Sequence, residues 1–174
     1  MKKEKDLFED MKEKILEMDP IYFQSKYFSI DGKSFNIKDN PWCFFQEIYR
    51  YMGLTILNKD SKPLIINKAR QTGGSSLALF TELFLIASGQ FGKNGKPPMR
   101  LMHCFPQLEI AGRFSKTKLN PTISSSKGIV VKGKNKLVPF IETRLDSTAA
   151  TKDSLSFKQF EGGSHLFIES TGLD

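Results

Sequence analysis

The sequence contains few of the residues that build disulfides and metal sites, and no long apolar run. Only two cysteines, Cys43 and Cys104, occur in 174 residues, and neither lies at a metal-ligand spacing. The longest apolar run, 83–87, is far shorter than the roughly 20 residues of a membrane span. The charged N-terminus lacks the apolar stretch of a signal peptide. We therefore expect a reduced, intracellular, soluble chain with no membrane partner.

Acidic residues are almost absent from the middle of the chain. The window 91–136 contains ten basic residues and a single acid, Glu109, a balance of +9 that exceeds the net charge of +7 of the whole chain. Such a segment attracts polyanions, nucleic acid first among them, because its cations neutralise phosphates and release counterions. The alternative is a lysine-rich surface that is only solvated.

Apolar periodicity and turn residues predict alternating elements. A helix over 4–18 is expected to end at Asp19-Pro20, and a second one after Pro41 is expected to end at Gly53, with short elements around a turn at Asp31-Gly32 between them. Farther on we expect a buried strand at 64–66, a buried helix ending at Gly89, a strand at 100–105, a helix over 107–119, and strands or hairpins within 128–136, 154–160 and 164–170. This βαβ alternation predicts an open parallel α/β sheet.

Several single residues have a predicted place in these elements. In the helix over 107–119, one face is expected to consist of Leu108, Ala111, Phe114 and Leu119. We expect no acidic partner near His103 or His165, so we interpret both as structural, and Cys104 as a small buried apolar residue. The glycines of 162–164 predict a hairpin turn.

The segment 68–76, KARQTGGSS, lies between the predicted strand and the predicted buried helix. A phosphate loop needs glycines that let N–H groups converge at a helix start, a lysine for the phosphates and a hydroxyl for Mg²⁺. In the G-x-x-x-x-G-K-[ST] register, Gly73 takes the second glycine and Ser75 the hydroxyl, whereas Gly74 replaces the lysine and Lys68 the first glycine. The alternative is a tight turn from strand to helix with Ser75 as N-cap.

The same segment resembles the phosphate loop of the large terminase subunits of tailed bacteriophages. Their K-[SA]-R-Q-x-G-K-[ST] pattern is matched at seven of eight positions by residues 68–75, and the departure is Gly74. Residues 19–49, 102–126 and 161–172 are similar to further stretches of that family, so the resemblance covers roughly 19–174.

This resemblance implies a three-layer α/β sandwich of the RecA-like P-loop NTPase class, incomplete at its C-terminal side. Residues 1–55 would form a helical, aromatic-rich arm, and residues 56–174 the first part of the ATPase domain. The implied activity is ATP-powered packaging of double-stranded DNA into procapsids, with ATP and Mg²⁺ as cofactors. The implied protein partners are the small terminase subunit and the portal, in the cytoplasm of an infected or lysogenic bacterial host.

The resemblance also implies roles for individual residues. Arg70 is the candidate for stabilising charge on the γ-phosphate, Ser75 for assisting Mg²⁺, and Gln46 for contacting adenine. The full set of implied nucleotide-binding residues is Gln46, Lys68, Arg70, Gln71, Thr72, Gly73, Gly74, Ser75 and Ser76.

The acidic pair that such ATPases need, and the nuclease domain of the family, are expected to lie beyond Asp174. We therefore expect the chain to be the front part of a longer ATPase and nuclease, with negligible hydrolysis on its own. Two alternatives remain: a helicase-like ATPase stimulated by nucleic acid, and a nucleic-acid-binding module that has lost ATPase activity.

Overall fold

The structure is a computed structural model of the 174-residue chain. The residues that it describes are 11–12, 16–30, 33–38, 43–55, 65, 73–91, 96–131, 133, 136–146 and 154–172.

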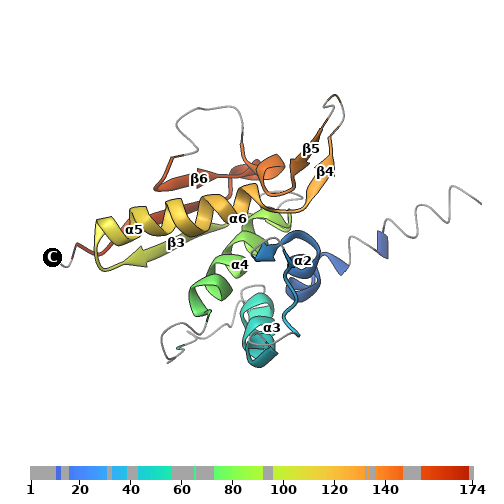
Figure 1. Ribbon diagram of the computed structural model, residues 1–174, viewed down its shortest axis with the longest axis horizontal. Coiled ribbons are helices and arrows are strands. Elements are labelled where there is room, and N and C mark those ends of the chain that lie inside the picture. The colour runs from blue at the N-terminus through green and yellow to red at the C-terminus, as the bar shows by residue number, and fades with distance from the viewer. Residues whose placement is uncertain are drawn as a thin grey trace, which may run out of the picture.

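Helices make up much of the described chain (Figure 1). They are, in chain order, α2 (Pro20–Tyr27), α3 (Gln46–Thr55), α4 (Gly74–Ala87), α5 (Leu108–Phe114) and α6 (Asn120–Ser124). A π-helical segment, η2 (Ser115–Leu119), joins α5 to α6, so residues 108–124 form one continuous helical rod. No described helix is long and apolar enough to cross a membrane.

The strands form one sheet of three strands and two separate hairpins. In the sheet, β3 (Arg100–Phe105) pairs in parallel with β7 (His165–Ser170), and β6 (Phe157–Gln159) pairs with the other edge of β7. The hairpins are β1 (Ser29–Ile30) with β2 (Lys33–Ser34), and β4 (Gly128–Val130) with β5 (Leu137–Pro139). The α/β class is therefore confirmed, as are the short elements predicted on either side of 31–32 and the strand at 100–105.

The sheet is mixed: β3 and β7 form the expected kind of parallel pair, and β6 adds an antiparallel strand. β6 runs antiparallel to β7 because only the short turn Glu161–Gly163 connects them. Gly162 and Gly163 have φ of 79° and 82°, which L side chains rarely adopt, and they allow the chain to reverse. The hairpin turn predicted from these glycines is confirmed.

Described helices cover one face of the sheet (Figure 1). Along β3, Leu101, His103 and Phe105 point to the covered face and are half-buried, whereas the residues between them are exposed. Met102 on the open face is 62% exposed. Cys104 lies on the same open face, so its predicted burial was wrong, because the alternation of a strand turns it away from the helices.

The core is centred on α4, and much of it is aromatic. Phe84, which is fully buried, lies 5.4 Å from Phe23 of α2 between ring centroids, and Phe23 lies 5.8 Å from Phe140. α2 and α3 pack against each other and against α4, on the side of α4 away from the sheet (Figure 1). Residues from the first third of the chain thus share one core with residues near position 140.

Two predicted helix ends have different outcomes. Ser88 is the C-cap of α4 and Gly89 follows with φ of 76°, so the predicted stop is confirmed. α3 continues past Gly53 to Thr55, so that predicted stop was wrong. A glycine inside a helix costs about 1 kcal/mol relative to alanine, and it ends the helix only where the chain turns left-handed.

Asp19 begins a helix as well as following one. Its carboxylate accepts hydrogen bonds from the amides of Ile21 (2.8 Å) and Tyr22 (2.9 Å), and Pro20 occupies the first turn of α2. These features are typical of a helix start, since proline has no N–H to leave unpaired there.

A polar cluster follows at the end of α2. The Tyr27 hydroxyl donates to Glu17 Oε1, and the Lys26 ammonium lies 2.7 Å from the same oxygen. Burial, with a contribution from the hydrogen bond to Glu17, raises the pKa of Tyr27 to about 12. The Tyr27 ring stacks on Phe140 with a centroid distance of 3.7 Å, which ties α2 to the later part of the chain.

Candidate functional site

The described part of the predicted phosphate loop is the first turn of α4. Gly73 has φ of 78° and precedes the helix, and its carbonyl accepts hydrogen bonds from the amides of Ser76 and Leu77, both at 3.0 Å. The amides of Gly74 and Ser75 have no carbonyl partner within the helix, as at any α-helix start. Amides without a partner inside the helix and the positive end of the helix dipole suit this turn to an anion.

The two serines of this turn differ in exposure. Ser75 is exposed and Ser76 is half-buried. The N-cap is Gly73, so the alternative in which Ser75 caps the helix was wrong. Because Ser75 lies one position inside the helix, its hydroxyl remains open to solvent and could approach a ligand or a hydrated Mg²⁺.

The first half of the predicted loop lies outside the described residues. This holds for Lys68, Arg70, Gln71 and Thr72, whose assigned roles remain predictions. From the strand expected at 64–66, the structure describes Ile65, which is 91% exposed and in no strand. The prediction of a buried strand was therefore wrong at Ile65, since β-branched residues favour a strand only where a partner strand is present.

Gln46, the predicted adenine contact, is the first residue of α3 and is half-buried. The preceding Phe45 is buried in the core, and α3 packs against α4. The structure thus brings α3 and α4 together, but among the described residues Gln46 makes no hydrogen bond to residues 73–76.

A histidine–carboxylate pair joins α4 to β3, and sequence reasoning missed it. His103 Nδ1 lies 2.8 Å from Glu82 Oε1 and 3.0 Å from Glu82 Oε2. The two side chains are only 14% and 17% exposed. The expectation that His103 lacks an acidic partner was wrong, because the partner lies 21 residues earlier on the preceding helix.

Aromatic rings hold this imidazole in place. Its ring stacks on Phe105 and Phe114, at centroid distances of 4.8 and 4.5 Å. A carboxylate at Nδ1 fixes the tautomer and the ring orientation, so the pair fastens α4, β3 and α5 together. One signal could have pointed to it: Glu82 is the single charged residue in the largely apolar helix α4, and such a residue needs a partner.

The described basic side chains of the segment 91–136 are all exposed to solvent. Its exposed members are Lys96, Arg100, Arg113, Lys116, Lys118, Lys127 and Lys136. Arg113 forms an ion pair with Glu109 at 2.6 Å, one helical turn away. Among the residues that the structure describes, no group of three or more His, Cys, Asp or Glu side chains could hold a metal ion.

No protein-family model, curated protein or solved structure matches this chain in our comparisons.

Proposed function

We propose that this chain is the nucleotide-binding part of a P-loop ATPase that translocates double-stranded DNA, like the large terminase subunits that its sequence resembles. The observation that carries the proposal is the start of α4: a left-handed glycine, Gly73, opens a buried helix that exposes Ser75 in its first turn. Such a turn offers amides to phosphate oxygens and a hydroxyl to Mg²⁺. The proposal includes the fold: within the α/β class, we assign the chain to the three-layer sandwich of P-loop NTPases.

The proposal gives each loop residue a role toward Mg-ATP. Lys68 supplies the cation that phosphate loops ordinarily carry at the position of Gly74, and Arg70 stabilises charge on the γ-phosphate. Ser75 assists Mg²⁺, while the amides of the first turn of α4 receive the phosphates. The packing of α3 on α4 supports a contact of Gln46 with the base.

Calorimetric titration of Mg-ATP into the chain tests this proposal. We expect saturable binding in the natural chain and its loss in Lys68→Ala. The matched control is Lys118→Ala, which removes an exposed lysine of η2 and should leave the affinity unchanged. Equal affinities of Lys68→Ala and the natural chain would contradict the role of Lys68.

A second variant tests the register of the loop. Gly74→Lys restores the ordinary lysine position, so it should tighten Mg-ATP binding if the motif is aligned as proposed. Weaker binding by a folded Gly74→Lys variant would count against this alignment.

The exposed basic residues favour a second candidate, a nucleic-acid-binding module without ATPase activity. This candidate predicts DNA binding that weakens steeply with salt and does not respond to ATP. In the leading proposal, DNA binding changes when Mg-ATP is added. The partners in the leading proposal are DNA, a small terminase subunit and a portal, in the cytoplasm of a bacterial host.

A further inference from the structure

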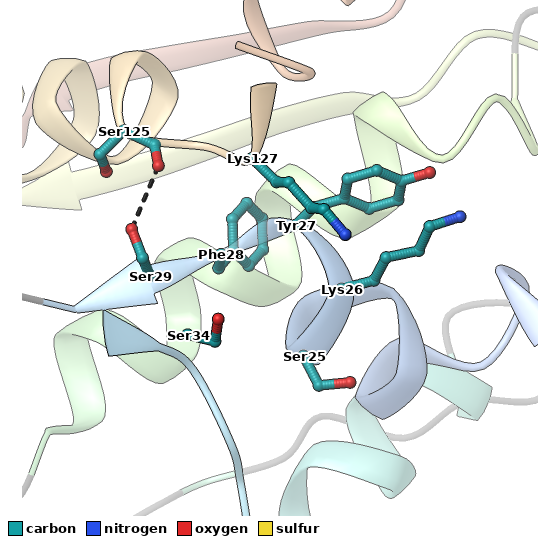
Figure 2. Close-up of a pocket in the computed structure, with 8 residues that line it drawn as sticks. All are labelled: Ser25, Lys26, Tyr27, Phe28, Ser29, Ser34, Ser125 and Lys127. Carbon is teal, nitrogen blue, oxygen red and sulfur yellow. Dashed lines mark hydrogen bonds between the residues drawn. The ribbon is translucent and has the colours of Figure 1, made fainter. Parts of the chain in front are cut away.

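A cavity of about 260 Å³ opens where three distant segments meet: the end of α2, the hairpin β1–β2 and the connection between α6 and β4 (Figure 2). Its polar lining consists of four serines and two lysines: Ser25, Ser29, Ser34, Ser125, Lys26 and Lys127. One water molecule occupies about 30 Å³ in the liquid, so the cavity has room for a small ligand.

The two lysines give the cavity a surplus of positive charge. Lys26 lies 2.7 Å from Glu17, so a carboxylate compensates its charge. Lys127 is exposed and has no ion-pair partner among the described residues. Figure 2 shows its side chain running toward Tyr27, with Lys26 drawn as a separate side chain at the end of α2. The uncompensated charge at this site is therefore that of Lys127.

The serines differ in whether their hydroxyl hydrogens are already used. Ser25 donates to the carbonyl of Tyr22 at 2.9 Å, and Ser29 to the carbonyl of Ser125 at 3.1 Å. Within the described part of the chain, the Ser34 hydroxyl makes no hydrogen bond, and it lies on β2 beside Ser29 of β1. Ser34 therefore offers a second donor in the lining of the cavity, besides the ammonium of Lys127.

We propose that this cavity binds a phosphate group. An ammonium and a hydroxyl are donors that phosphate oxygens accept, and hydrogen bonds to a charged group are stronger than neutral ones. Lys127 belongs to the basic segment 91–136, so the phosphate has two possible sources: the backbone of a nucleic acid, or free phosphate. The site is separate from the start of α4, and the inference does not rest on the function proposed above.

The test is an NMR titration of the full chain with inorganic phosphate and, separately, with a short DNA duplex. We expect saturable shifts of the amides of Ser29, Ser34 and Lys127. Lys127→Gln should weaken binding of whichever of the two ligands causes these shifts about tenfold or more, as expected for one charged hydrogen bond. Lys118→Gln removes the same charge from η2, outside the cavity, and should leave phosphate binding unchanged.

A second variant and the two ligands separate the outcomes. Ser34→Ala, at an exposed position that tolerates a small side chain, should weaken binding by a smaller factor than Lys127→Gln. If the phosphate belongs to a nucleic acid, Lys127→Gln lowers the slope of log K against log salt concentration for DNA binding by about one. If it is free phosphate, inorganic phosphate shifts these amides and the duplex does not. Absence of saturable shifts with both ligands, or equal losses in Lys127→Gln and Lys118→Gln, would overturn the proposal.

Discussion

Two helical segments of this molecule are buried to very different degrees. α4 is enclosed by the sheet on one side and by α2 and α3 on the other, and its two central polar residues have partners: Thr81 donates to the Leu77 carbonyl at 2.9 Å, and Glu82 binds His103. The rod of 108–124 buries one stripe, formed by Ala111, Phe114, Ser115, Leu119 and Ile123. The comparison separates a helix that is packed on two sides from a rod that presents basic side chains to solvent.

The largest effect should come from the centre of α4. Phe84→Ala should lower the free energy of unfolding by about 3–5 kcal/mol, because it leaves a cavity beside Phe23. Lys116→Ala on the rod should change it by less than about 0.5 kcal/mol. Urea unfolding followed by circular dichroism measures both. Similar losses in the two variants would remove the distinction between α4 and the rod.

The buried stripe of the rod can be tested within the rod itself. Leu119 is fully buried and Leu108 is 70% exposed, although the sequence pattern predicts both on one face. Leu119→Ala should cost roughly 2–5 kcal/mol of unfolding free energy and Leu108→Ala less than about 0.5. The same urea measurement decides, and a larger loss at Leu108 would reverse the assignment of faces.

Breaking the ion pair of α4 should cost more unfolding free energy than breaking the ion pair of the rod. Glu82→Gln leaves the half-buried His103 without its carboxylate and should cost roughly 1–3 kcal/mol. Glu109→Gln breaks the exposed pair with Arg113 and should cost at most about 0.5 kcal/mol. Thermal unfolding of both variants at neutral pH compares them, and equal losses would show that the pair with His103 contributes no more than a surface contact.

The smallest predicted effect on stability concerns Tyr27 of α2, which packs against α4, and it appears only at high pH. The pKa of Tyr27 is raised to about 12, while an unfolded tyrosine has a pKa near 10. The folded state therefore favours the neutral hydroxyl of Tyr27. The stability that this preference contributes is fully present below pH 10 and is lost as the pH rises toward 12. Unfolding free energies measured across this window should fall more steeply for the natural chain than for Tyr27→Phe. Parallel pH profiles would contradict the raised pKa.

Local patterns predicted the elements whose causes are local. The hairpins β1–β2 and β6–β7 and the stop at Gly89 depend on residues close in sequence, and the structure confirms them. The strand at 100–105 is also confirmed, although its partner β7 lies far along the chain. Periodicity grouped Leu108 with the buried face of the helix, but it does not tell which turns the rest of the protein covers, and Leu108 is exposed.

In the candidate site, too, features with local causes could be predicted, and features that depend on distant segments could not. Gly73 and Gly74 are adjacent residues, and their sequence alone predicts a change of backbone direction before a helix, which the structure confirms at φ of 78°. The pairing of Glu82 with His103 depends on how a helix packs on the following strand, and the cavity beside Lys127 depends on segments about 100 residues apart. The single charge of α4 signals that Glu82 needs a partner, but no sequence spacing identifies that partner as His103, and none reveals the cavity.

The π-helical segment has a consequence for changes in chain length. A π-helical turn closes each hydrogen bond over five residues where an α-helix uses four, so Ser115–Leu119 contains one residue more than a regular helix would need to join α5 to α6. Deleting one residue from 116–118 would let the rod become α-helical while Ile123 keeps its side of the helix. The same deletion inside α6 would rotate the positions after it by about 100°. The rod is therefore tolerant of shortening at one place, the segment that carries Lys116 and Lys118.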